Sequence, residues 1–175
     1  MTRKSTGGVT LIELLVTLAV LAVMLGIALP SFADLIRDTR LTTAINSVHV
    51  ALSYTRSESI KRGRRVTICT SANQLDCAPG IGWHRGWMAF DDRNGNGIRD
   101  AGETIMRVGA ALPSGITITG NNPVRNYVSY VPSGTTRTIG GALQMGTITA
   151  CSGGRVRQIV ISATGRPRVV REGNC

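Results

Sequence analysis

The stretch Gly7-Gly8-Val9-Thr10-Leu11-Ile12-Glu13-Leu14 opens an apolar run that continues to Leu29. The twenty-one residues from 9 to 29 contain a single charge, on Glu13. As a helix they would extend roughly 31 Å, close to the hydrocarbon thickness of a bilayer. Arg3 and Lys4 precede the run, so we expect the N-terminus to stay cytoplasmic and the rest of the chain to cross outward.

A secretory signal peptide is the main alternative for an apolar segment at this position. Its apolar core is shorter and ends in a small-x-small cleavage site. Here the small residues, Gly7 and Gly8, come before the apolar run. The order of these features therefore favours a retained membrane helix over a cleaved signal.

The same features resemble the class III signal of type IV pilins and type II secretion pseudopilins. In that family a prepilin peptidase cuts after the glycine, N-methylates the new first residue and leaves the helix on the mature protein. The resemblance implies a leader of residues 1–8, with cleavage after Gly8 and methylation of Val9, where the family usually carries Phe. Pro30 falls where many members carry a helix-kinking proline.

Glu13 takes the position of the family's glutamate, the fifth mature residue. A carboxylate within a membrane helix costs about 2.5–3.5 kcal/mol on insertion scales, so such a residue suggests a function. The resemblance implies that Glu13 pairs with the amine of Val9 on a neighbouring subunit during assembly. The alternative is a residue near the cytoplasmic end that merely reaches the interface.

The chain of 175 residues carries a net charge of +10, and the excess is uneven. Residues 104–175 contain eight arginines and one acid, Glu172. A basic region of this kind favours a polyanion or an anionic surface as partner. A basic surface that only aids solubility is the alternative.

Four cysteines are present, Cys69, Cys77, Cys151 and Cys175. A chain that crosses the inner membrane reaches an oxidising space, where an even count suggests two disulfides. Three connectivities are possible, and we favour Cys69–Cys77 with Cys151–Cys175 because each closes a local loop. A zinc site is the alternative, but it lacks a CxxC pair or a nearby histidine.

Residues 30–62 are predicted to continue the helix in amphipathic form. Leu41, Ile45, Val48 and Leu52 recur at helical spacing. Gly63 is a natural helix stop. The helix therefore has an apolar half at 9–29 and an amphipathic half that packs on a domain.

From residue 63 to 175 the pattern changes to short strands and turns. The Asp92–Gly97 segment, rich in Asn and Gly, indicates a hairpin, and residues 163–166 indicate another turn. The predicted strands are Val66–Ser71, Trp87–Phe90, Glu103–Val108, Ile116–Thr119, Tyr127–Val131, Thr147–Cys151, Gln158–Ser162 and Pro167–Arg171. We expect an α+β fold in which the long N-terminal helix packs on antiparallel sheets.

The β-rich region also resembles the GspH/FimT branch of pilin-like proteins. The resemblance rests on the segments 62–69, Gly82-Trp83 with Gly86-Trp87, 90–97 and 100–103. That branch contains minor pilins of type IV pili and minor pseudopilins of type II secretion. It implies a type IV pilin-like fold and other pilins as partners. We expect no enzymatic activity and no cofactor.

Gly165-Arg166-Pro167-Arg168 is the main candidate site. Some FimT-like minor pilins bind DNA during natural transformation, and a Gly-Arg-x-Arg motif near the C-terminus resembles their signature. Arginine forks bind phosphate bidentately, and such contacts are independent of sequence and sensitive to salt. The favoured Cys151–Cys175 bridge would also enclose Arg155, Arg157 and Arg171. The alternative is a solvated turn.

Two further clusters have simpler explanations. Lys61, Arg62, Arg64 and Arg65 follow the helix C-terminus, where positive charge is favourable, although they could extend a DNA track. The ligand spacing of an EF-hand calcium loop is matched by Asp92, Asn94, Asn96, Asp100 and Glu103. We favour a structural turn there and no metal, because strands flank the loop and Arg99 replaces the usual aliphatic residue.

Other chemistry is weakly indicated. Trp83 and Trp87 could stack on bases, although core packing is the better interpretation for Trp87. No nucleophile motif lies near His49 or His84, and phosphate-binding, dinucleotide and metalloprotease motifs are missing from the sequence.

The favoured function is therefore that of a minor type IV pilin that binds DNA during uptake. It would sit in the bacterial inner membrane as a single-pass protein with a periplasmic C-terminal domain, and then enter the pilus or reach the cell surface. The alternatives are a structural minor pilin that primes assembly without binding DNA, and a type II secretion pseudopilin.

Overall fold

The computed structural model describes residues 8–173 and 175, and for residues 27–31 it describes the backbone alone. Residues 1–7 of the expected leader, with Arg3 and Lys4, lie outside the described residues. The side chain of Pro30, expected to kink the helix, also lies outside them. Two compact units are present, residues 1–38 and 39–175, and the helix α1 (Leu11–Arg62) contributes to both.

Local sequence explains where α1 begins and ends. At its start, the Thr10 hydroxyl accepts a hydrogen bond from the Glu13 N–H at 3.3 Å, and the Glu13 carboxylate accepts one from the Thr10 N–H at 3.5 Å. This reciprocal pair is a capping box. At its end Gly63 takes a left-handed φ of 62° and donates its N–H to the Ile60 carbonyl, as C-terminal glycines do. The stop predicted at Gly63 is confirmed.

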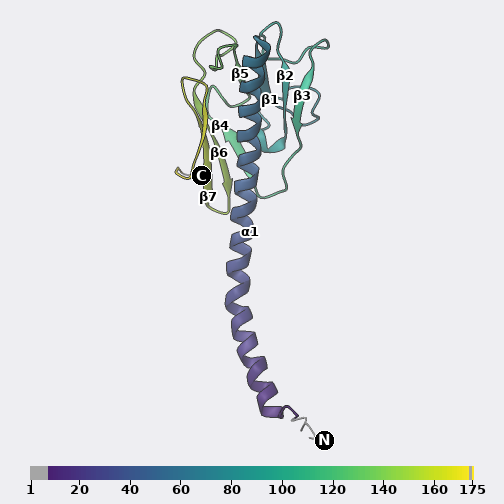
Figure 1. The fold of residues 1–175 in the computed structure, drawn as a ribbon, viewed down its shortest axis with the longest axis vertical. Coiled ribbons are helices and arrows are strands. Elements are labelled where there is room, and N and C mark those ends of the chain that lie inside the picture. The colour runs from purple at the N-terminus through teal and green to yellow at the C-terminus, as the bar shows by residue number, and fades with distance from the viewer. Residues whose placement is uncertain (1–7, 174) are drawn as a thin grey trace, which may run out of the picture. The chain divides into compact units, whose positions relative to one another are not determined.

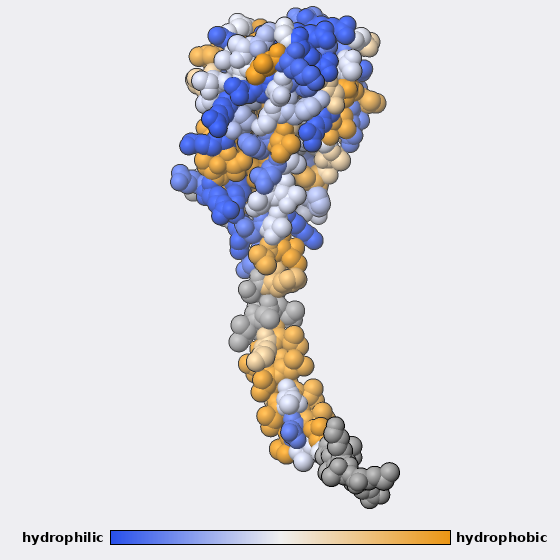
Figure 2. Space-filling model, viewed as in Figure 1, coloured by the Kyte–Doolittle hydropathy of each residue, from blue (hydrophilic) through white to orange (hydrophobic). Residues whose placement is uncertain are grey.

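The described part of the first unit is mainly helix, which begins at Leu11, and its apolar side chains are uncovered. From Val9 to Leu25 its large hydrophobic residues are 49–79% exposed, and Figure 2 shows hydrophobic residues over this part of the chain. Within the described residues, however, no helix meets the length and apolarity required of a membrane span.

The second unit contains two four-stranded antiparallel sheets beside the last part of α1 (Figure 1). The first has the order β3-β2-β1-β5 and the second β4-β6-β7-β8. A short 3-10 helix, η1 (Trp83–Arg85), precedes β2. The strands are β1 (Val66–Thr70), β2 (Trp87–Asp91), β3 (Ile105–Gly109), β4 (Thr117–Gly120), β5 (Tyr127–Tyr130), β6 (Gly146–Ser152), β7 (Arg155–Ile161) and β8 (Pro167–Val170).

A single main core joins α1 to both sheets. The predicted apolar face of the helix is buried, with Leu41, Ile45, Val48 and Leu52 at most 1% exposed. It packs in one cluster with Ile68 of β1 and Ile159 of β7. Removing such apolar surface from water supplies the main force that joins a helix to its sheets. The α+β fold predicted from the sequence is confirmed.

Two disulfides tie the second unit. Cys69 is bonded to Cys77, with their Cα atoms 5.7 Å apart, and Cys151 is bonded to Cys175, with their Cα atoms 5.8 Å apart. This is the connectivity that the short loops favoured. Cys69 forms a small second cluster with Met88 and Phe90, and Cys77 packs against it. The Cys151–Cys175 bridge encloses the β7–β8 hairpin.

Each of the eight predicted strands has a counterpart, with boundary shifts. The largest correction concerns β7, which begins at Arg155 rather than at Gln158. The reason is the two-residue turn Gly153-Gly154, which allows Ser152 to pair directly with Arg155. The loop after β2 does connect antiparallel neighbours, but it runs to residue 104 before β3 begins.

Candidate functional site

The Gly-Arg-Pro-Arg motif covers the end of the turn after β7, with Gly165 and Arg166, and the start of the edge strand β8, with Pro167 and Arg168. The Gly165 N–H donates to the Ser162 carbonyl at 2.9 Å, and Gly165 takes a left-handed φ of 76°. A Cβ atom at Gly165 would lie 2.4 Å from the Gly134 carbonyl oxygen, and 3.0 Å from the Thr135 Cα. Glycine is therefore required twice here, by its backbone conformation and by close contact with the turn at 131–135.

Helix α1 holds this turn from the other side. The His49 Nε2 lies 3.3 Å from the Pro167 carbonyl, to which it can donate. The Arg56 Nε donates to the Gly134 carbonyl at 2.8 Å. His49 and Arg56, about two helical turns apart on α1, thus fix both the start of β8 and the turn against which Gly165 packs.

A groove lies between α1 and the motif. It consists of two adjoining hollows, of about 430 and 650 Å³, and both are lined by His49, Arg166 and Pro167. Arg56 lines the first hollow and Arg168 the second. Both motif arginines are exposed, whereas Gly165 and Pro167 are buried. The groove contains three arginines and no carboxylate, a composition that suits an anion.

The other three predicted arginines lie apart from the motif. Arg168 pairs with Val160, whereas Arg155 pairs with Ser152 at the far end of β7. Arg157 lies three residues from Val160, or about 10 Å along the strand, and Arg171 follows the end of β8. The disulfide loop therefore encloses all five arginines, but only Arg166 and Arg168 line the groove.

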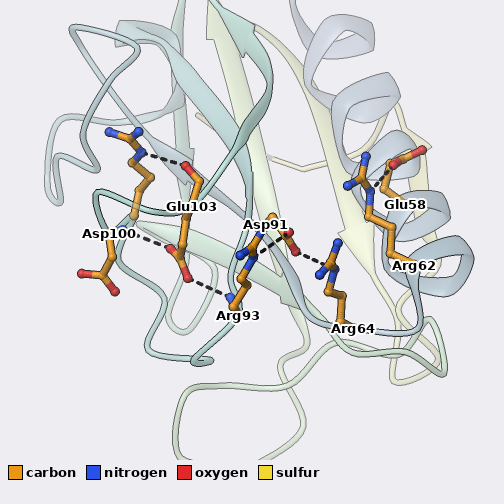
Figure 3. A network of polar contacts seen from close by, with 8 residues as sticks. Glu58, Arg62, Arg64, Asp91, Arg93, Asp100 and Glu103 are labelled. Atoms are coloured by element: carbon orange, nitrogen blue, oxygen red, sulfur yellow. Dashed lines mark hydrogen bonds and ion pairs between the residues drawn. The ribbon is translucent and has the colours of Figure 1, made fainter.

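The basic cluster at the end of the helix contains Lys61, Arg62, Arg64 and Arg65, and ion pairs engage most of its members (Figure 3). Arg62 Nε lies 2.6 Å from the Glu58 carboxylate, whose hydrogen bond raises the pKa of Arg62. Arg64 and Arg93 both pair with Asp91, at 3.1 and 3.3 Å, and Asp91 is 1% exposed at its side chain. Lys61 lies 3.9 Å from Glu58, and Arg65 donates to Ser129. This cluster therefore has structural partners, which the helix-end interpretation anticipated in part.

The Asp92–Glu103 loop uses its polar groups on itself. Asn94 and Asn96 donate to the Asp100 carboxylate at 2.7 and 3.0 Å. Glu103 accepts the backbone N–H groups of Arg93 and Asp100, at 2.7 and 3.0 Å, as Figure 3 shows. Among the described residues, no three His, Cys, Asp or Glu side chains converge as they would around a metal ion. These bonds give the polar groups of the loop partners within the loop, and the choice of a structural turn over a calcium site stays a prediction.

Asp92 is the most perturbed carboxyl of this loop. It is fully buried and accepts the Thr67 hydroxyl at 2.6 Å and the Gly97 N–H at 3.2 Å. Burial raises the pKa of Asp92, and the nearby Glu103 carboxylate adds to the rise. Desolvation disfavours the charged form, so Asp92 takes up a proton more readily than a carboxyl in water does. Its bonds to Thr67 and Gly97 make it a structural group.

The two tryptophans are part of the interior. Trp83 is 1% exposed and donates its indole N–H to the Val124 carbonyl at 3.1 Å, and Trp87 is 5% exposed. Neither presents a face on which a base could stack. Stacking by Trp83 and Trp87 is therefore excluded in this conformation, and any nucleic-acid contact falls to the arginines.

Sequence reasoning missed two features of the sites. One is the capping box, although Thr10-x-x-Glu13 is its known pattern. It gives Glu13 a bond within its own chain in addition to the assembly role expected of it. The other is the contribution of His49 and Arg56 to the groove, for which the sequence holds no local signal.

An N-terminal helix with an exposed apolar beginning, packed further along on two disulfide-tied antiparallel sheets, defines a type IV pilin-like protein. The model of the prokaryotic N-terminal methylation motif matches residues 3–29, and the model of the type II transport protein GspH matches residues 44–165. The chain belongs to the GspH family. It is a minor pilin or pseudopilin of the GspH/FimT type.

Known relatives agree with this assignment. The pilin-like protein PilA1 of Thermus thermophilus is 30% identical over 172 residues, covering 97% of this chain and 99% of that protein. The type IV minor pilin FimU of Pseudomonas aeruginosa superposes with a TM-score of 0.55 at 20% identity, over 78% of this chain and 90% of FimU. The minor pseudopilin EpsH of Vibrio cholerae gives 0.52 at 11% identity, over 79% and 99%. The FimU and EpsH structures therefore share the fold of this chain.

Proposed function

We propose that this minor pilin binds DNA through the groove between α1 and the Gly165–Arg168 turn, and that it does so during DNA uptake in natural transformation. The observation that carries the proposal is the exposure of Arg166 and Arg168 beside a groove free of carboxylates. The expected ligand feature is the phosphate backbone, so binding should be independent of sequence and weakened by salt.

Two properties of the turn suit it to this task. Its backbone is fixed by the contact of Gly165 with Gly134 and by the His49–Pro167 hydrogen bond. Arginines on a fixed turn lose less conformational entropy on binding than arginines on a free tail. Arg155, Arg157 and Arg171 would then form a secondary contact area roughly 10–17 Å further along the hairpin.

The family also implies interactions of the N-terminal region. Type IV pilin-family proteins are anchored by an N-terminal helix and exported to the periplasm or pilus, and the methylation motif implies contact with the prepilin peptidase and other pilins. We propose cleavage after Gly8, methylation of Val9 and an assembly contact through Glu13. The exposed apolar residues from Val9 to Leu25 support a helix that is covered by lipid or by other pilins. The proposed domain boundaries remain 1–8, 9–29, 30–62 and 63–175.

Fluorescence anisotropy would test DNA binding. The full chain in a nonionic detergent would be titrated into a labelled duplex between 50 and 200 mM salt. The variant Arg166→Ala/Arg168→Ala would be compared with Arg85→Ala/Arg125→Ala, which removes the same charge from two exposed positions outside the groove.

We expect the motif variant to lose binding and the control variant to keep most of it. Equal losses would mean that the chain attracts DNA only through its net charge. The lack of any binding at 50 mM salt would refute the proposal and leave a structural minor pilin, or a type II secretion pseudopilin.

A further inference from the structure

Arg56 has an unusual position among the arginines of the second unit. It is half-buried on α1, and its Nε is committed to the Gly134 carbonyl at 2.8 Å. A guanidinium has five N–H donors. No further hydrogen bond to a described residue involves the Arg56 terminal nitrogens, and the side chain lines the same hollow as Arg166. Arg56 is thus held in place through Nε, while its side chain lines the groove.

The chemistry of the surrounding wall favours a phosphate. The helix side of the hollow that Arg56 and Arg166 share also presents Ser53 and Ser57. Hydroxyl groups are neutral donors that phosphate oxygens accept. Arg56 and Arg166, which come from segments 110 residues apart in the sequence, therefore line one hollow together with two small hydroxyl side chains.

We propose that Arg56 binds a phosphate of the DNA backbone opposite Arg166, so that helix α1 forms the second wall of the interface. This inference rests on the DNA binding proposed above. It changes the site from a single loop into a two-walled groove. Because Arg56 is already ordered by Gly134, little side-chain freedom is lost when the phosphate arrives.

The salt dependence of binding provides the test. Each phosphate contact on duplex DNA contributes about 0.9 to the slope of log K against log salt concentration. Arg56→Gln should lower the magnitude of that slope by about 0.9. If the affinities of the two proteins converge at 1 M salt, this slope change corresponds to a loss of roughly 15-fold at 50 mM salt and roughly 4-fold at 200 mM salt.

The matched control is Arg40→Gln on the same helix. Arg40 is exposed and lies sixteen residues earlier, about 24 Å along the axis. The substitution Arg40→Gln removes the same charge outside the groove, so the salt slope of DNA binding by this variant should match that of the unchanged protein. Arg56→Lys keeps the charge and should keep the slope, and urea unfolding of each full-length variant in detergent monitors the fold.

The outcomes separate the two proposals. If the unchanged protein binds DNA and Arg166→Ala/Arg168→Ala abolishes binding, but Arg56→Gln behaves like Arg40→Gln, the role of Arg56 is refuted and the function stands. A weaker affinity with an unchanged slope would also refute it, since Arg56 would then only position the turn through Gly134. If the unchanged protein does not bind DNA, both proposals fall together.

Discussion

Replacement of Gly165 by alanine tests whether two turns must touch to build the candidate site. A non-glycine residue in the left-handed conformation costs about 1–2 kcal/mol. At Gly165 the new methyl group would also lie 2.4 Å from the Gly134 carbonyl oxygen, a backbone atom that cannot simply rotate away. Overpacking of this kind costs typically 1–3 kcal/mol. We therefore expect Gly165→Ala to lower the free energy of unfolding by about 2–5 kcal/mol.

Gly154→Ala is a closely matched control. Gly154 has a φ of 78°, against 76° at Gly165, but a Cβ there would meet no atom within 4 Å. It should lose only the conformational component of about 1–2 kcal/mol. The difference between the two variants isolates the contact between the turns at 131–135 and 163–166.

The assay is urea unfolding of the full chain in detergent, followed by the fluorescence of the buried Trp83 and Trp87. DNA affinity would be measured on the same samples under conditions where both variants are folded. We expect Gly165→Ala to bind DNA more weakly than Gly154→Ala, because the turn must move to admit the methyl group. Equal stability and equal affinity of the two variants would refute the requirement for close contact.

Three further predictions concern stability, and each is measured by urea unfolding. The chain-entropy relation predicts that loss of the Cys69–Cys77 bridge, with a separation of 8 residues, costs about 2.5 kcal/mol of stability. Loss of the Cys151–Cys175 bridge, with a separation of 24 residues, should cost about 3.4 kcal/mol. The relation is contradicted if the paired Cys→Ser variant of the shorter loop is the less stable of the two. Because burial raises the pKa of Asp92 above its unfolded value of about 3.9, its contribution to stability is greatest below that pH and falls as the pH rises toward the folded pKa. Asp92→Asn should remove this dependence, and an unchanged pH profile would show that Asp92 does not cause it. Glu103→Ala should cost about 1–3 kcal/mol, because it deprives the N–H groups of Arg93 and Asp100 of their acceptor, and a neutral effect would show that water replaces it.

The fold was predictable from the sequence because its signals are local. The spacing of Leu41, Ile45, Val48 and Leu52 marks the buried helix face, and these residues are indeed in the core. Alternating strands and Gly-rich turns mark the sheets. The order of strands in the two sheets was not predictable in this way, because strand pairing depends on contacts between residues far apart in the chain.

The candidate site was predictable only in part. The motif Gly165–Arg168 is contiguous and can be recognised by its residue types. His49 and Arg56 join it from segments more than 100 residues away in the sequence, and neither has a neighbour that marks it. The burial of Trp83 was equally hidden, since a Gly-rich loop gives no sign that its tryptophan points inward.

The edge position of β8 has a consequence for backbone motion near the motif. A strand with a single paired neighbour normally opens more easily than the strands inside its sheet, and its amide hydrogens exchange sooner. β8 pairs with β7 alone, but His49 anchors its beginning and the Cys151–Cys175 bridge follows its end. The amide of Arg168, which faces Val160 of β7, should therefore exchange more slowly than the paired amides of the other edge strands while the bridge is intact. Reduction of the bridge would leave β8 held only at its beginning and by its pairing with β7, so the oxidation state of Cys151 and Cys175 would influence how often Arg168 leaves its place.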